Sequence, residues 1–332
     1  MYPKSIVMKN ESTSQPSSSS SAILDKLSEY GIVIAFIFLC ICLSFANENF
    51  MTWGNWVNVL RQTSINGILA IGMTYVILTK GIDLSVGSLL AVSGIVAASL
   101  VTGETAGSVW LAVAVGLTVG MFLGALNGLV VARLSVAPFV VTLGMLSIAR
   151  GFTFIYNDGM PIANLSPEFR YLGQGMLGGV PVPVIVLALI FALFWFILNR
   201  TTFGRYVYAV GGNEKSAKTS GIRTRLVVFS VYVISGLLSA LAGLILAART
   251  TSALPQAGVA YELDAIAAVV IGGTSLNGGV GTLTGTLVGA LIIGVINNGL
   301  DLLGVSSYYQ QVIKGTIIVA AVLIDVSRKK KN

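Results

Sequence analysis

The chain has 332 residues, of which 55% are hydrophobic and only 10% are charged. A soluble domain usually carries about 25% charged residues, so this composition excludes an ordinary soluble protein. The net charge of +7 does not indicate nucleic-acid binding, because the basic residues lie in short connections between apolar runs and form no long polar surface. We therefore expect an integral membrane protein without a nucleic-acid partner, surrounded by membrane lipid.

The residue types exclude several kinds of chemistry. No histidine is present, which removes histidine-based catalysis, metal ligation and proton relays. Cys40 and Cys42 lie in one apolar run and point to different sides of a helix, so no disulfide framework or metal site is predicted. No lysine follows a glycine, so the chain has no P-loop, and we expect neither enzymatic activity nor a bound cofactor. The glycines of 278–285 lack the spacing of a dinucleotide loop, and we interpret them as tight helix packing in the membrane.

Ten apolar runs predict an all-α integral membrane protein with about ten transmembrane helices. Residues 1–29 are predicted to form a cytoplasmic disordered or amphipathic segment, residues 30–326 the membrane domain and residues 327–332 a basic cytoplasmic tail. No cleavage pattern follows the first run, so we expect it to be retained as a span. The runs are Tyr30–Ala46, Val57–Leu78, Val86–Val101, Val109–Ala132, Val136–Tyr156, Val182–Leu198, Leu226–Ala248, Ala265–Gly273, Leu283–Leu300 and Tyr308–Asp325.

The run Ala265–Gly273 is short, because a spanning helix needs about 20 residues. It is predicted to be a short or re-entrant helix, which is tolerated only where protein or a water-filled cavity surrounds it. If all ten runs cross and the N-terminus is cytoplasmic, 15 of the 20 basic residues lie inside and only Arg170 and Arg249 lie outside. The positive-inside rule favours this topology, which places both termini in the cytoplasm. Arg61, Arg150 and Lys314 lie within runs.

The inner connection Arg200–Arg225 has the pattern of a short helix. Asn213 is a suitable N-cap, Glu214 suits the positive end of the helix dipole, and Gly221 is a natural stop. Such a helix could dock on a partner, or the segment could be a solvated basic loop that only sets the topology. On the pattern alone the two interpretations are equal.

Polar residues near or within the spans are candidates for the translocation pathway. They are Asn66, Asp83, Ser85, Asn127, Asn297 and Asn298. Helix capping explains Asp83 and Ser85 somewhat better than substrate contact, and hydrogen bonding between helices explains each amide somewhat better than a polar pathway. The acids Glu262 and Asp264 open a helix, where the dipole favours them, although an outer gate or a protein contact is the alternative. Lys314 requires wet or paired surroundings.

Several long segments carry a resemblance to a known family. They are Gly72–Ala91 (GMTYVILTKGIDLSVGSLLA), Gly204–Glu214 (GRYVYAVGGNE), Ser220–Ile222 (SGI), Tyr261–Gly279 (YELDAIAAVVIGGTSLNGG) and Asn297–Gln310 (NNGLDLLGVSSYYQ). From Trp56 to Val326 the chain resembles the permease subunits of bacterial ABC importers for monosaccharides. The resemblance implies ribose as the first candidate substrate, with another pentose, a hexose or a furanose-like signal molecule as alternatives.

The resemblance also implies partners and a place in the cell. These are a second copy of the chain, a cytoplasmic ATP-binding subunit that uses ATP and magnesium, and a periplasmic sugar-binding protein, assembled at the bacterial inner membrane. The coupling contact with the ATP-binding subunit would involve Gly212, Asn213, Glu214, Ala217, Gly221 and Ile222. Many importers have Glu-Ala-Ala and a later glycine at this element, whereas this chain has Glu214-Lys215-Ser216 and Gly221.

A stand-alone secondary transporter is the main rival class. Such proteins commonly use ionisable residues near the membrane midplane as ion relays. Here histidine is absent, and Asp83, Glu262, Asp264 and Asp301 lie near the ends of the predicted spans. The sequence therefore favours the importer subunit.

Overall fold

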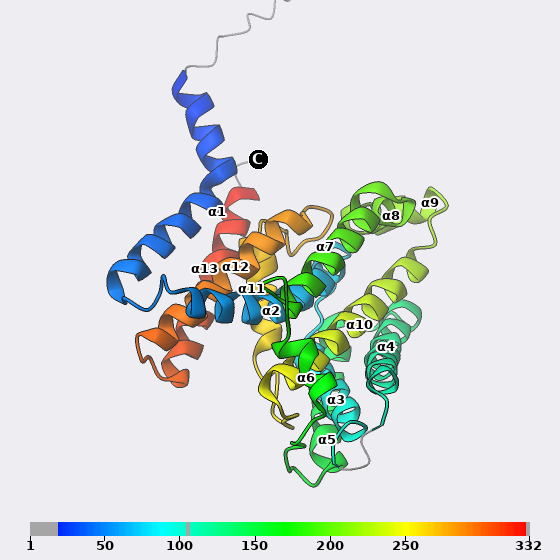
Figure 1. Cartoon of the computed structure of the whole chain (residues 1–332). Helices are drawn as coiled ribbons and strands as arrows, with labels where there is room; N and C mark the ends of the chain where they lie inside the picture. Colours follow the sequence, from blue (N-terminus) through cyan, green and yellow to red (C-terminus); the bar gives the residue numbers. More distant parts are fainter. Residues whose placement is uncertain (1–18, 104–106, 330–332) are drawn as a thin grey trace, which may run out of the picture.

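A computed structural model describes residues 19–103 and 107–329 as a helical bundle (Figure 1). Two strands of two residues each, β1 Met176–Leu177 and β2 Val180–Pro181, form a small antiparallel hairpin. The described helices are α1 Ser19–Ala46, α2 Trp53–Leu78, α3 Val86–Ser99, α4 Val109–Leu134, α5 Pro138–Tyr156, α6 Pro167–Gln174, α7 Val182–Arg200, α8 Thr202–Gly212, α9 Glu214–Thr219, α10 Thr224–Thr250, α11 Tyr261–Ile271, α12 Leu283–Leu302 and α13 Ser307–Lys329.

The centre of the bundle is formed by α2 and α10. Helix α2 is buried almost continuously from Thr63 to Leu78 and packs against α7, α10, α11 and α12. Helix α10 packs against α2, α3 and α4. By contrast, α4, α5 and α7 expose large apolar side chains along their outer faces, including Phe122, Phe152 and Phe196. A helix that is apolar on its exposed face requires lipid or another apolar partner around it, so the outer faces of α4, α5 and α7 are suited to contact lipid or a second apolar surface.

Each of the ten predicted runs coincides with a helix. Five helices within the described residues are long and apolar enough to cross a membrane, namely α4, α5, α7, α10 and α12. The helical membrane architecture is therefore confirmed, and the count of ten crossings stays a prediction. The helix α1 begins at Ser19, inside the predicted N-terminal segment, and α13 continues to Lys329, inside the predicted tail. Residues 1–18 and 330–332 lie outside the described part.

The short predicted run Ala265–Gly273 lies in α11. The irregular segment 251–260 before this helix covers the remaining length of the bundle. The preceding segment 251–260 pairs with the α5–α6 connection through an isolated bridge between Ile162 and Ala253. At the far end of α11 the following loop reaches α2, where the Gly279 N–H donates to the Leu78 carbonyl at 2.9 Å. The chain thus passes from one end of the bundle to the other as about ten non-helical residues followed by an eleven-residue helix.

Side chains of α5 supply hydrogen-bond donors to the carbonyl groups of the irregular segment 251–260. Arg150 of α5 donates from Nη1 to the carbonyls of Pro255 (2.6 Å) and Ala257 (2.8 Å). Thr153, one turn later, donates to the Pro255 carbonyl at 2.9 Å. Without water, unpaired carbonyl groups at this depth would be strongly unfavourable, which explains an arginine inside a predicted span.

Candidate functional site

The segment around α9 forms as its sequence predicts. Asn213 is the N-cap of α9, and its Oδ1 accepts the N–H of Ser216 at 3.0 Å. Glu214 follows at the first position, where a carboxylate complements the positive end of the helix dipole. Gly212 ends the preceding helix α8, so the two helices meet at Asn213. The short helix and its N-cap are therefore confirmed.

The end of α9 is a Schellman motif, a helix stop in which a left-handed residue lets the chain bond back to the last turn. Gly221 has φ +84° and donates its N–H to the Lys218 carbonyl at 3.1 Å. The Ile222 N–H donates to the Ala217 carbonyl, also at 3.1 Å. Ala217 is buried, which adds the apolar contact typical of this motif. The predicted glycine stop is confirmed.

Close backbone packing fixes this segment to the rest of the bundle. Gly211 lies directly against the Leu78 carbonyl at the end of α2, leaving no space for a side chain. Gly279 approaches the backbone of Gly211 and Gly212 so closely that a Cβ would lie 2.8 Å from Gly212 Cα. Tyr208 of α8 donates from Oη to the Gly281 carbonyl at 2.8 Å.

The prediction that the glycines of 278–285 serve tight helix packing is thereby corrected for three of the four. Gly278, Gly279 and Gly281 lie in a loop with positive φ, where Gly278 and Gly279 pack against the α8–α9 junction and Gly281 packs against Thr274. Only Gly285 packs helix to helix, against Gly272.

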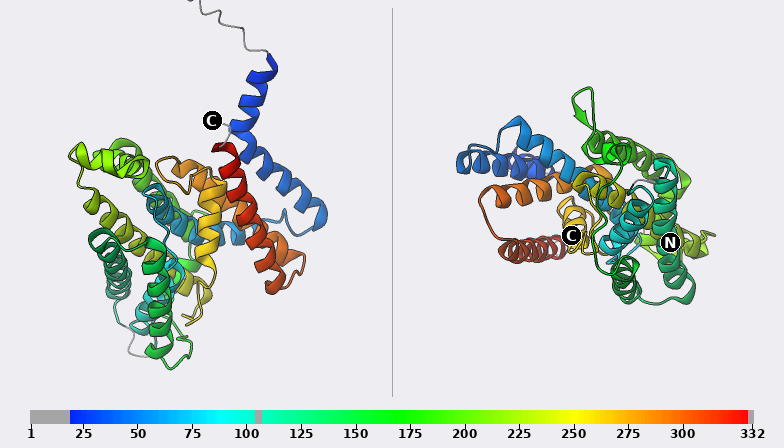
Figure 2. Two further views of the ribbon diagram at one scale, coloured as in Figure 1. Left: turned by 180° about the vertical axis from the view of Figure 1, so that it is seen from behind. Right: turned by 60° about the horizontal axis from the view of Figure 1, so that its bottom comes forward.

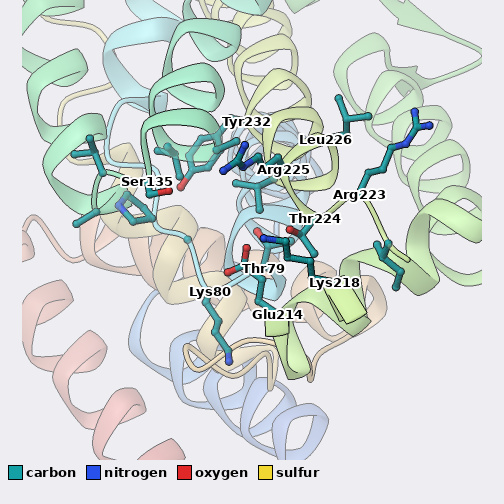
Figure 3. A pocket seen from close by; sticks show the side chains of 18 residues that line it. Thr79, Lys80, Ser135, Glu214, Lys218, Arg223, Thr224, Arg225, Leu226 and Tyr232 are labelled. Carbon is teal, nitrogen blue, oxygen red and sulfur yellow. The ribbon is translucent and has the colours of Figure 1, made fainter. Parts of the chain in front are cut away.

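A cavity of about 670 Å³ lies between α9, the start of α10 and the connections that follow α2 and α4 (Figure 3). Four basic side chains and one carboxylate line it, namely Lys80, Lys218, Arg223, Arg225 and Glu214. The connections after the second, fourth and sixth predicted spans therefore meet at one end of the bundle, as an alternating topology requires. This end is the one that the distribution of basic residues assigns to the cytoplasm.

Asp83, Ser85 and Asn127 form one buried hydrogen-bonded group. The Asp83 Oδ1 accepts the Ser85 N–H at 3.0 Å and the Ser85 hydroxyl at 2.6 Å, and its Oδ2 accepts the Ser235 hydroxyl at 2.7 Å. Asn127 donates from Nδ2 to the Ser85 Oγ at 2.9 Å. The group joins the α2–α3 connection to α4 and α10. Ser85 occupies the N-cap position of α3 without a side-chain capping bond, and Asp83 accepts its N–H instead.

The other candidate amides lie in different contacts. Asn297 donates to the Asp264 Oδ2 at 3.2 Å, and Lys314 forms an ion pair with the same oxygen at 3.0 Å. The expectation of paired surroundings for Lys314 is thus confirmed. Asn298 and Asn55 exchange two hydrogen bonds, at 2.7 and 2.9 Å, which link α12 to α2.

The six candidates do not converge on one surface. Asn66 is buried in α2 with its Oδ1 unpaired, and within the described part of the chain no hydrogen bond joins it to the other candidates. The acids Asp83 and Asp264 lie near helix ends, as the sequence indicates, yet both are buried in the protein.

The sequence does not indicate Ser235 and Asn55 as partners of Asp83 and Asn298, nor the separate Thr74–Thr286 hydroxyl pair at 2.8 Å. Small polar residues are common in membrane helices, and no sequence signal separates these from the rest.

Comparisons with known proteins give one consistent result. The family model described as the permease component of branched-chain amino acid transport systems matches residues 55–322. The chain is 49% identical to the ribose import permease of Haemophilus influenzae over 88% of this chain and 91% of that protein. It is 50% identical to the ribose import permease of Escherichia coli K12, over 90% and 94%. The D-allose permease of Escherichia coli is 40% identical, over 90% and 91%. No solved structure gives a significant match.

Proposed function

Since the chain belongs to the family of permease components of branched-chain amino acid transport systems, we propose that it is the membrane-spanning subunit of an ATP-driven importer of ribose. The observation that carries the choice of sugar is the gradient of similarity. Ribose import permeases of three bacterial species are 49–50% identical to the chain, whereas the allose and arabinose permeases of Escherichia coli are 40% and 37% identical. Other pentoses and hexoses are the competing substrates.

The proposed assembly contains two copies of this chain, two cytoplasmic ATP-binding subunits and a periplasmic sugar-binding protein. ATP and magnesium act in the ATP-binding subunits. The capped helix α9 supports this arrangement, because a partner that transmits force needs a rigid contact, and α9 is fixed through Gly211, Gly279 and Tyr208 to α2 and to the loop after α11. Closure of the ATP-binding subunits would shift the two copies between outward-open and inward-open states.

The test uses the purified complex of permease and ATP-binding subunit in nanodiscs. We expect ribose-loaded binding protein to stimulate ATP hydrolysis more than binding proteins loaded with allose or arabinose. Uptake in cells should stop when the ATP-binding subunit carries a substitution that abolishes hydrolysis. Uptake that persists with this disabled subunit would contradict the proposal and favour a secondary transporter, for which the ion pair of buried Asp264 with half-buried Lys314 is the one supporting observation.

A further inference from the structure

Two long helices begin at the cavity beside α9, and neither has a capping side chain. Helix α5 starts at Pro138 and α10 at Thr224, and both residues line the cavity. The side chains of the preceding residues, Ala137 and Arg223, accept no N–H of the first turn, and neither first turn contains an acidic residue. The positive ends of two helix dipoles therefore lie at the same cavity without a negative group of their own.

Basic side chains add to the positive charge of this cavity. Arg225 lies in the first turn of α10, where a cation opposes the helix dipole instead of balancing it. Lys218 approaches from the last turn of α9. Glu214 is the carboxylate in the cavity wall, and within the described part of the chain it forms no ion pair with either cation. The wall thus keeps a net positive charge that a bound anion would neutralise.

A buried hydroxyl in the cavity wall also lacks a partner. Tyr232 of α10 is fully buried and lines the cavity, and among the described residues its hydroxyl has no hydrogen-bond partner. This hydroxyl lies against Gly81, which lines the same cavity and has no room for a side chain. Arg225 lies on the Tyr232 side of the cavity, whereas Lys80 extends out of it (Figure 3). A buried donor without an acceptor is unfavourable, and a ligand oxygen would satisfy it.

Another part of the wall is apolar and adjoins the surfaces suited to lipid. Val136 and Leu226 line the cavity and are exposed. Leu134 at the end of α4 and Phe139 at the start of α5 are exposed next to Val136 in the chain. Figure 1 and the left-hand view in Figure 2 both show α4 and the start of α10 at the edge of the bundle. A ligand can therefore place an anionic group among the cations and an apolar part against the outer surface.

We propose that this cavity binds the headgroup of an anionic phospholipid, whose phosphate is held by Arg225, Lys218 and first-turn N–H groups of α5 and α10. Guanidinium groups, ammonium groups and helix N-termini all bind phosphate. Basic pockets between membrane helices on the cytoplasmic side bind such headgroups.

A carboxylate of the ATP-binding subunit would use the same charges. Lipid is favoured because it also has acyl chains to cover the exposed Val136 and Leu226, which a carboxylate leaves uncovered. The site goes beyond the proposed function and does not depend on which sugar is imported.

The experiment measures the binding of phosphatidylglycerol to the full-length permease by native mass spectrometry, with phosphatidylcholine as the neutral comparison. We expect the unaltered permease to prefer phosphatidylglycerol. Arg225→Gln should weaken phosphatidylglycerol binding by about tenfold and leave phosphatidylcholine binding unchanged. Arg225→Lys, which retains the charge, should weaken it less. The matched control is Arg205→Gln, at an exposed position of α8 outside the cavity, which should bind both lipids normally.

Tyr232→Phe provides a readout that a purely structural role would not move. Because the hydroxyl has no partner in the described part of the protein, its removal should not lower the melting temperature in phosphatidylcholine nanodiscs. It should nevertheless reduce the gain in melting temperature that phosphatidylglycerol provides. The melting temperature in phosphatidylcholine also verifies the folding of the other variants, and Lys218→Gln, at an exposed position, replaces Arg225→Gln if the latter does not fold.

Three results would overturn the lipid site. The first is normal phosphatidylglycerol binding by both Arg225→Gln and Lys218→Gln. The second is inorganic phosphate stabilising the permease in phosphatidylcholine nanodiscs as much as phosphatidylglycerol does, because the cavity would then take free phosphate. The third is loss of the co-purifying ATP-binding subunit from Arg225→Gln with unchanged phosphatidylglycerol binding, which would assign these charges to that partner.

Discussion

At the scale of single residues, Asp83 shows how a charged group can be placed inside the bundle. It has no exposed surface, and its two oxygens accept three hydrogen bonds from Ser85 and Ser235. Because these donors come from two different segments, the carboxylate holds the α2–α3 connection against α10. The contacts point to a structural role, although the carboxylate was chosen from the sequence as a candidate for the translocation pathway.

Replacing Asp83 by alanine should therefore destabilise the protein. Two hydroxyls and one N–H would lose their acceptor, and each buried unpaired group costs roughly 1–3 kcal/mol. We expect a lower melting temperature in detergent for Asp83→Ala, and a smaller decrease for Asp83→Asn, whose amide oxygen still accepts from Ser85. Asp158→Asn, at an exposed position, is the control. A variant that melts normally yet transports no sugar would instead place Asp83 on the pathway.

At the scale of elements, α9 depends on a backbone conformation that few residues adopt. Gly221 has φ +84°, and a Cβ at this position would meet no atom within 4 Å. A substitution here therefore acts through backbone strain and not through a clash. A left-handed conformation costs a non-glycine residue roughly 1–2 kcal/mol, and asparagine tolerates it better than a β-branched residue does.

We expect Gly221→Val to reduce the amount of ATP-binding subunit that co-purifies with the permease, because α9 would end in a different direction. Gly221→Asn should retain most of it and serves as the matched control. Co-purification is measured after verifying that both variants insert in equal amounts. Full recovery of the ATP-binding subunit with Gly221→Val would show that the contact runs through another loop, such as 272–282.

The sequence predicts α9 correctly because its signals are local. An N-cap at Asn213 and a left-handed glycine at 221 act within one or two turns, so their effects are readable in the order of residues. The packing of Gly279 against Gly211 is different, since these residues are brought together only by the fold. The same limit explains why Asn66, Asn127 and Asn297 look alike in sequence but lie in separate contacts. Partners from distant helices decide what each amide does.

At the scale of the whole molecule, the bundle has two chemically different ends. The cavity end carries Lys80, Lys218, Arg223 and Arg225, and the opposite end carries the β1–β2 hairpin together with Arg61 and Arg249, which are both hydrogen-bonded to Gln174. The hydrophobic runs and the distribution of charge predict this general plan. They do not predict that the chain crosses at α11 as an irregular segment, because the partner carbonyl and guanidinium groups are about a hundred residues apart.

The orientation can be measured by labelling single cysteines in a variant that lacks Cys40 and Cys42. A membrane-impermeant maleimide added to the periplasmic side should label cysteines introduced at Asp158 and Leu177. Cysteines at Ser135 and Lys218 should react only after the inner membrane is permeabilised, because basic residues are retained on the cytoplasmic side. Labelling of position 218 in intact cells would reverse the topology.

The pairing of Asp264 with Lys314 has a consequence for biosynthesis. Helix α11 has eleven residues and contains a buried carboxylate, so it is too short and too polar to move from the translocon into lipid on its own. Its ionic partner belongs to α13, which leaves the ribosome after α11 and α12. The pairing that stabilises α11 is therefore completed only after α13 has been synthesised. A chain that terminates before α13 would keep Asp264 with Asn297 as a donor but without its ionic partner. We expect quality-control proteases to degrade such an unfinished chain faster than the full one.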